Sequence, residues 1–321
     1  MKFSYRTLSP LLLLCTLTLR GQDTWHGTVS GMQMMYNPAF AGLREAPSVN
    51  LSAFTFLPGK GFNLRSVYAS YDAYYSGLHG GAGVWLSDDI SGEVMNDLRG
   101  GLSYSYHFRA GRNTFVTAGL TASFISRGIR SGSIILPDDI DPFRGITGGG
   151  AGYANPGAIN RFDLGTGFTV TSGPWTGGVS VMHLTRPLLS DEETEYNRLD
   201  RLFSLTAAVD LSPRSGDLSL LPSAAVIIQG SEFRIYLGSE ASWRGLMAGL
   251  AMWHTKGGFT SAQCSIGYDI SFVKIMMSYS YILSGGAAPI SGTAIVRAGA
   301  VFGFGNVEKS RGVHIIKLPL L

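Results

Sequence analysis

In Ser261-Ala262-Gln263-Cys264-Ser265-Ile266-Gly267-Tyr268-Asp269-Ile270-Ser271-Phe272, apolar residues alternate with small or polar ones without a break. Successive side chains of a β-strand point to opposite faces, so this period of two predicts a strand with one apolar and one polar face. The apolar face carries Ala262, Cys264, Ile266, Tyr268, Ile270 and Phe272. Such a strand separates two media of different polarity.

The same alternation recurs from Ser48 onward and divides the chain into about fourteen predicted strands. They cover residues 48–56, 62–75, 79–86, 97–110, 113–129, 161–173, 175–186, 201–213, 218–230, 232–244, 245–256, 259–272, 273–284 and 293–305. Strands of a soluble β-sandwich, the alternative fold, average about 5–6 residues, and most of these are longer. Their length suits tilted strands that cross a hydrocarbon layer of about 30 Å. We therefore expect the apolar faces to contact lipid and the polar faces to line a lumen.

Composition favours the same fold and excludes other classes. Only 15% of the 321 residues are charged, whereas about a quarter is usual in a soluble domain. Beyond the N-terminal leader, no segment has the run of about 18 apolar residues that a membrane helix needs. The net charge of +3 is dispersed, so no nucleic-acid partner is indicated. The predicted fold class is all-β: a transmembrane antiparallel β-barrel of about 14 strands with short periplasmic turns and longer extracellular loops, in contact with outer-membrane lipid.

Loop lengths give an independent indication of the strand count. The four connections expected to be longest are residues 87–96, 130–160, 187–200 and 285–292. Each of them follows an odd-numbered strand. With a periplasmic N-terminus, all four lie outside the cell, as is typical of bacterial outer-membrane barrels.

The chain begins like a secretory protein. Lys2 and Arg6 precede an apolar core from Leu8 to Leu19, and Gly21 supplies a small residue at a cleavage point. We therefore expect a signal peptide over residues 1–21, followed by an N-terminal periplasmic or plug segment over residues 22–47. The barrel is expected over residues 48–305. Residues 306–321 would form a C-terminal tail that lies in the periplasm or folds back into the lumen.

The segment before the first strand contains Tyr36-Asn37-Pro38-Ala39-Phe40-Ala41-Gly42. Pro38 has a fixed φ and no N–H donor, and Gly42 can adopt a positive φ, so the backbone is expected to bend here. Tyr36 and Phe40 supply bulky apolar side chains for burial. This motif predicts a lumen plug or a partner-docking element, formed by Tyr36, Asn37, Pro38, Phe40 and Gly42.

The sequence contains no pattern that indicates catalysis. The histidines lie in no serine-hydrolase turn or zinc-binding spacing, and His183 and His254 are interpreted as interface or lumen residues. Asp138, Asp139 and Asp141 lie in the longest predicted external loop. Their spacing matches no calcium loop, so we interpret them as extracellular-loop contacts. The prediction is a protein with no enzymatic activity, no cofactor and no metal.

At this point the chain resembles the PorP/SprF family, outer-membrane proteins of the type IX secretion system of Bacteroidetes. The resemblance is carried by residues 36–42, by Leu136-Pro137-Asp138-Asp139-Ile140-Asp141, and by Gly178-Val179-Ser180-Val181-Met182-His183-Leu184. The tail over residues 306–321 departs from the family pattern and leaves its C-terminal contact open.

The resemblance implies a fourteen-stranded barrel without enzymatic activity. It implies a role in secretion or surface attachment of cargo proteins through their C-terminal sorting domains, and in gliding motility in motile species. It also implies contact with a PorE-like peptidoglycan-binding lipoprotein and with the PorK, PorL, PorM and PorN machinery.

Two other functions stay open. A FadL-like channel for hydrophobic small molecules also has fourteen strands and an Asn-Pro-Ala near its N-terminus, as Asn37-Pro38-Ala39 does here. A general porin is compatible with Arg and Glu residues on the polar faces, although the apolar segment around Phe40 favours a blocked lumen.

Overall fold

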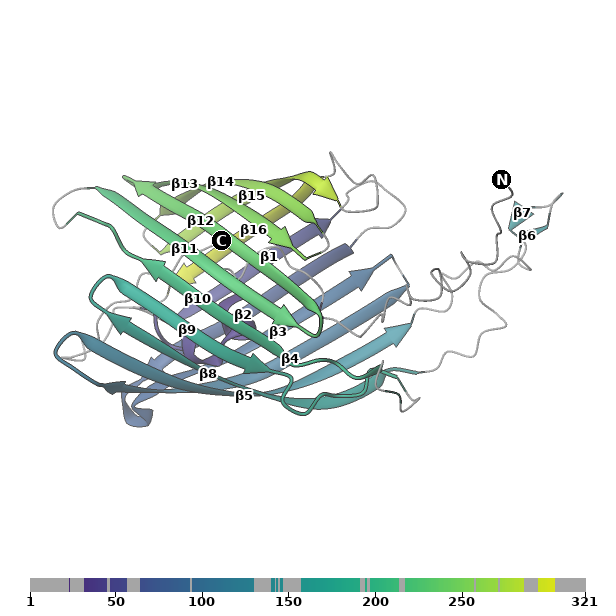
Figure 1. The fold of residues 1–321 in the computed structure, drawn as a ribbon, viewed down its shortest axis with the longest axis horizontal. Coiled ribbons are helices and arrows are strands. Elements are labelled where there is room, and N and C mark those ends of the chain that lie inside the picture. Colours follow the sequence, from purple (N-terminus) through teal and green to yellow (C-terminus); the bar gives the residue numbers. More distant parts are fainter. Residues whose placement is uncertain are drawn as a thin grey trace, which may run out of the picture.

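The alternating segments pair side by side and close into one barrel of fourteen antiparallel strands in the computed structural model (Figure 1). Each strand pairs with its neighbours along the chain, and the first strand pairs with the last. The structure describes residues 23, 32–44, 47–56, 64–92, 94–129, 140–141, 143, 145–146, 157–190, 194, 197–213, 217–256, 258–270, 272–285 and 294–303. Within these ranges, no helix combines the length and the apolar character that a membrane crossing requires.

The barrel strands are β1 (Ser48–Phe56), β2 (Leu64–Tyr75), β3 (Gly80–Ser91), β4 (Met95–Arg109), β5 (Thr114–Ile129), β8 (Ile159–Ser172), β9 (Trp175–Met182), β10 (Leu202–Val209), β11 (Leu218–Gln229), β12 (Glu232–Trp243), β13 (Leu246–Thr255), β14 (Phe259–Ile270), β15 (Val273–Gly285) and β16 (Ala294–Gly303). A separate two-stranded sheet is formed by β6 (Ile140–Asp141) and β7 (Gly145–Ile146). The short helices are α2 (Gln33–Tyr36), η3 (Pro38–Phe40) and η4 (Ser76–Leu78).

Because neighbouring strands are antiparallel, all odd-numbered members of the ring end at one rim. We call the rim where β1, β3, β5, β9 and β11 end the loop rim, because it carries the long connection from β5 to β8. The opposite rim, where β2, β4 and β8 end in tight turns, is the turn rim. Figure 1 shows the strands inclined together around the ring.

The faces of the strands are divided as the sequence predicts. On β14, Ile266 is 63% exposed and Tyr268 52% exposed on the outer face, whereas the inward Ser261 and Gln263 are 0% and 4% exposed. The other strands repeat this pattern of apolar residues outside and small polar residues inside. The predicted membrane barrel and its fourteen strands are therefore confirmed.

One predicted loop is wrong. The stretch Ser87–Asn96 was expected to connect two strands, but β3 continues to Ser91 and β4 begins at Met95, which leaves residues 92–94 as the connection. An acidic pair resembles a solvated loop in the sequence. In the structure Asp89 points inward and is 2% exposed, so the alternation simply continues through it. Long connections therefore distinguish the two rims less sharply than the sequence suggests.

The seventh strand is also shorter than predicted. The expected strand over residues 175–186 ends at Met182, because His183 turns the backbone with φ +58°. The segment after β9 then leaves the wall. Its partner β10 is equally short and ends at Val209.

The barrel interior contains an apolar core as well as polar residues. Methionines of the N-terminal segment, Met32, Met34 and Met35, pack with inward aromatic side chains of the wall, among them Tyr68 and Trp85. The remaining members are Tyr36, Ala41, Met182, Leu202, Ala225, Ile227, Tyr236 and Trp253. Burial of one such large side chain contributes about 1.5–3 kcal/mol, so this core stabilises an interior that the sequence predicts to be mainly polar.

The outer face gives a direct test of the lipid assignment. Leu250 lies in the middle of β13 and is 73% exposed. Replacing it with Arg would place a charge in the hydrocarbon layer, so Leu250→Arg should lose about 2–4 kcal/mol of unfolding free energy in lipid vesicles. The control Leu250→Phe keeps the face apolar and should change stability by less than about 1 kcal/mol. Equal effects of the two substitutions would contradict the assignment.

Candidate functional site

The candidate site is the N-terminal segment that lies inside the barrel, here called the luminal segment: Asp23 and residues 32–44. The backbone N–H of Asp23 donates to Oε1 of Gln229 at 3.0 Å, and Gln229 is the last residue of β11, at the loop rim. The N–H of Gly42 donates to Oδ2 of Asp72 at 2.9 Å, and Asp72 lies near the end of β2, at the turn rim. The luminal segment therefore reaches from one rim towards the other.

Asn37 fixes the middle of the luminal segment to the wall. Its side chain is fully buried, and its Oδ1 accepts a hydrogen bond from the N–H of Ala39 at 2.9 Å, which caps the short helix η3. Its Nδ2 donates to the carbonyls of Phe168 on β8 and Val179 on β9, at 3.3 and 3.4 Å. Pro38 follows at the first helical position, where its missing N–H costs nothing.

The wall has no side chains where the luminal segment touches it. A Cβ on Gly119 of β5 would come closer than 3.0 Å to the backbone of Pro38 and Ala39. A Cβ on Gly167 of β8 would clash in the same way with the side chain of Asn37. Inward glycines therefore let the backbone of the motif lie directly on the strands.

The end of the motif is fixed at the turn rim. The carbonyl of Ala41 accepts a hydrogen bond from Oγ of Ser105 at 2.7 Å. Gly42 has φ +66°, and a Cβ there would come closer than 3.0 Å to the carbonyl oxygen of Ala73 and to Gly81. Both the backbone angle and the close approach require glycine at position 42.

The two bulky residues of the motif lie in different parts of the interior. Tyr36 is 4% exposed and belongs to the apolar core, and its carbonyl accepts a hydrogen bond from Oγ of Ser180 at 2.5 Å. Phe40 is 6% exposed and packs on Leu43 nearer the turn rim. The structure thus brings together all five residues that the sequence singles out in this motif.

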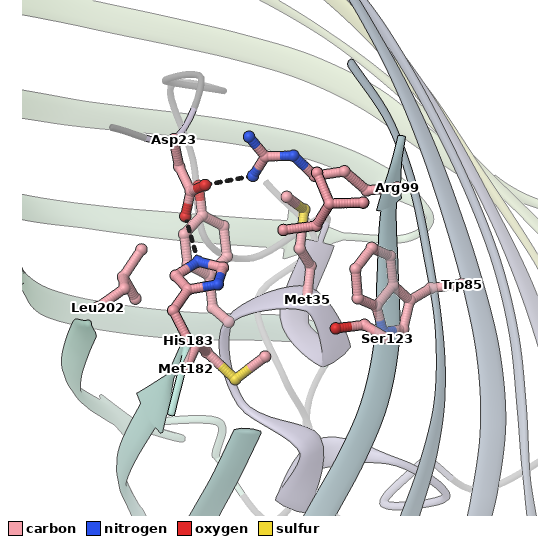
Figure 2. Close-up of a pocket in the computed structure, with 10 residues that line it drawn as sticks. Asp23, Met35, Trp85, Arg99, Ser123, Met182, His183 and Leu202 are labelled. Atoms are coloured by element: carbon pink, nitrogen blue, oxygen red, sulfur yellow. Dashed lines mark hydrogen bonds and ion pairs between the residues drawn. The ribbon is translucent and has the colours of Figure 1, made fainter. Parts of the chain in front are cut away.

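A charged cluster holds the other end of the luminal segment. The Asp23 carboxylate forms an ion pair with Arg99 of β4, and its Oδ2 lies 2.7 Å from Nε2 of His183 (Figure 2). His183 is also bound on its other side, because its Nδ1 lies 2.7 Å from Oδ2 of Asp163 on β8. Arg99 has a further carboxylate partner in Asp97, at 3.4 Å.

Protonation in this cluster is set by opposing effects. Burial by itself raises the pKa of Asp23, but the charges of Arg99 and His183 hold that pKa well below its usual 3.8. Burial lowers the pKa of His183, which lies just after β9, but the charge of Asp23 and hydrogen bonds to Asp163 and Asp23 raise it to about 9. Asp23 is therefore ionised and His183 protonated at neutral pH.

The remaining residues singled out in the sequence lie elsewhere. Asp138 and Asp139 lie outside the described residues, and only the backbone of Asp141 is described, in β6. His254 is exposed on β13, with its Nδ1 2.9 Å from Oγ1 of Thr260. Among the described residues, no group of three or more His, Cys, Asp or Glu could hold a metal ion.

Asp23 and Arg99 are the residues that sequence reasoning missed. Arg99 interrupts the small residues of an inward face, which is a signal for a luminal charge. Nothing in the sequence around Asp23 distinguishes it. His183 was recognised as a lumen candidate, but not as a partner of Asp23.

The fold resembles those of solved outer-membrane barrels. The CymD monoaromatic hydrocarbon channel aligns with a TM-score of 0.50 and 12% identity, over 87% of this chain and 94% of that chain. A Pseudomonas aeruginosa FadL homologue aligns with a TM-score of 0.45 and 11% identity, over 81% and 90%. The Acinetobacter baumannii protein Omp33 aligns with a TM-score of 0.46 and 9% identity, over 82% and 100%. Identities this low support the fold alone.

A closed barrel with an apolar outer face and an occupied interior defines a β-barrel protein of the bacterial outer membrane. The family model described as "Type IX secretion system membrane protein PorP/SprF" matches residues 22–294, and the chain belongs to this PorP/SprF family. A search of the curated proteins found none that matches the chain. The family and these structural neighbours are secretion components, channels and porins, which are not enzymes.

The glycine contact on β5 can be tested with a matched pair of variants. Gly119→Val should push Pro38 and Ala39 away from the wall, because overpacking of this kind costs about 1–3 kcal/mol. The displaced segment should raise single-channel conductance in planar bilayers. Gly128→Val is the control, because Gly128 lies on the same strand and a Cβ there meets nothing within 4 Å. Equal conductance of both variants and the wild type would show that this contact does not seat the segment.

The His183 contact predicts a pH dependence. Its folded pKa of about 9 exceeds the ordinary 6.5, so its contribution to stability is complete below pH 6.5 and is lost as the pH rises through 9. The contribution is about 3 kcal/mol at most. The melting temperatures of the wild type and His183→Gln should therefore differ most near about pH 6 and converge by about pH 9.5. A difference that stays constant over this range would exclude a charged His183.

Proposed function

We propose that the protein is a non-enzymatic component of the type IX secretion system that supports secretion or surface attachment of sorting-domain cargo without passing it through its own lumen. The observation that carries this proposal is the luminal segment. Buried contacts along it involve β2, β4, β5, β8, β9 and β11. A cargo chain could cross the barrel only after displacing it.

A barrel closed in this way acts through its rims. The luminal segment leaves the interior at the turn rim, next to the start of β1, so that rim joins the plug to the wall. We assign the turn rim to the periplasm. There Gly42 and its surroundings would contact a PorE-like lipoprotein or the PorK, PorL, PorM and PorN machinery. The loop rim would then face outwards, and the connection that holds Asp138, Asp139 and Asp141 would contact cargo or its sorting domain.

The second candidate function is a FadL-like channel for hydrophobic molecules. The apolar core favours it, because Trp85, Met182 and Trp253 give the interior a surface that apolar molecules would wet. Against it, those side chains already pack on Met35 and Tyr36 of the luminal segment. A general porin is favoured least, because a water-filled path would have to pass the same buried residues.

The experiment is a gene deletion in the parent bacterium, complemented with the wild type or with the double variant Tyr36→Ala, Phe40→Ala. Under the proposal, the deletion leaves sorting-domain cargo trapped or released unattached, and the wild-type gene restores surface display. The wild-type protein itself should conduct little in planar bilayers, whereas the double variant should conduct more or disturb cargo display.

Different outcomes separate the candidate functions. Normal cargo display after deletion would exclude the secretion role. Loss of long-chain or aromatic hydrocarbon uptake together with normal display would favour the channel. High conductance of the wild type would favour a porin.

A further inference from the structure

Two buried cations converge on one carboxylate at the loop rim. Arg99 is 2% exposed and His183 is 7% exposed, and both contact the Asp23 carboxylate. They come from different parts of the wall, β4 and the segment after β9. Figure 2 shows the guanidinium of Arg99 and the imidazole ring of His183 directed at Asp23 from two sides.

The positions of both cations are set by residues other than Asp23. Nδ1 of His183 lies 2.7 Å from Oδ2 of Asp163, and the other oxygen of Asp163 accepts a hydrogen bond from Oγ1 of Thr185 at 2.8 Å. Asp97 lies 3.4 Å from Arg99 and accepts a hydrogen bond from Nε of Arg127 at 2.6 Å. Partners of this kind orient a binding group before its ligand arrives.

Asp23 leaves part of this site unused. Nε of Arg99 and Nε1 of Trp85 are buried donors with no hydrogen-bond partner in the part of the chain that the structure describes. Both residues line one cavity together with Asp23, Met35 and Met182. The free volume of about 20 Å³ has room for one or two water molecules. A buried donor without a partner costs about 1–3 kcal/mol, so the site has donors for more acceptor atoms than Asp23 supplies.

The connection from β9 to β10 folds over the site. Leu189 and Leu199 are buried against Ile125, whose side chain points into the lumen from β5. The N–H of Leu199 donates to the carbonyl of Pro187 at 2.9 Å, which holds this connection in a compact turn. The site is thus enclosed near the loop rim.

We propose that Arg99 and His183 form a luminal binding site for a monocarboxylate, and that Asp23 is the intramolecular ligand that occupies it. The two cations supply charge and hydrogen bonds to both oxygens of one carboxylate. The carboxylates of Asp97 and Asp163 stand behind the cations and disfavour a phosphate dianion, which carries more charge and volume. A carboxylate from outside competes with Asp23, and its binding detaches the start of the luminal segment from the wall. This inference does not depend on the proposed function.

The test is to remove the tethered ligand and to supply a free one. Purified full-length Asp23→Ala protein in detergent is titrated with sodium acetate, with sodium chloride adjusted to keep ionic strength constant. The melting temperature should fall on substitution and rise again with acetate in a saturable way, by about 2–4 °C. Acetamide, the neutral analogue, and methylphosphonate, a dianion, should have no such effect. The wild type should not respond to acetate, because Asp23 fills its site.

Asp217→Ala is the matched control. It also breaks an Asp–Arg pair, with Nε of Arg244 at 2.8 Å, but this pair is exposed. Acetate should not stabilise it, and an equal response in both variants would overturn the proposal. If Asp23→Ala does not fold, Asp23→Ser keeps a polar side chain and leaves the same space for acetate. Absence of any acetate response in the folded variant overturns the proposal.

Discussion

The structure depends on the pairing of β1 with β16, which runs from Ser48 opposite Gly303 to Phe56 opposite Ile295. In a hydrocarbon layer every backbone N–H and C=O must have a partner, so a sheet can cross the membrane only if it has no free edge. Closure of the ring satisfies this requirement. It also determines that each strand has an outer face in lipid and an inner face towards an enclosed space, which is the alternation seen in the sequence.

The enclosed space of a fourteen-stranded ring is wider than wall side chains alone would fill, since barrels larger than about eight strands enclose cavities. This protein fills part of it with its own N-terminal residues. Where the luminal segment lies against the wall, the wall carries Gly119 and Gly167; where the segment carries slender methionines, the wall carries Tyr68 and Trp85. Shape complementarity between segment and wall is therefore distributed along both, and charge pairing is confined to the loop rim at Asp23.

Much of the fold could be predicted because a period of two is a local property, visible in a stretch such as residues 261–272. The extension of β3 was missed because an inward Asp89 looks like a loop residue when its partners across the lumen are unknown. The motif around Asn37 was recognisable, since Pro38 and Gly42 constrain the backbone by themselves. The contact of Asp23 with Arg99 and His183 could not be predicted, because it joins residues whose proximity depends on the register of several strand pairs and on the path of the luminal segment.

The position of the luminal segment immediately before β1 links two events in the biogenesis of the barrel. Because β1 forms the seam with β16, the residues that fill the interior enter β1 directly through Arg44 and Ser48. A ring that closed first would have to admit a bent, partly apolar segment through a rim. A ring that closes around the segment avoids that step, and the interior packing then forms together with the last pair of strands. The plug thus serves as an internal template for its own barrel, in addition to any role it has in the finished protein.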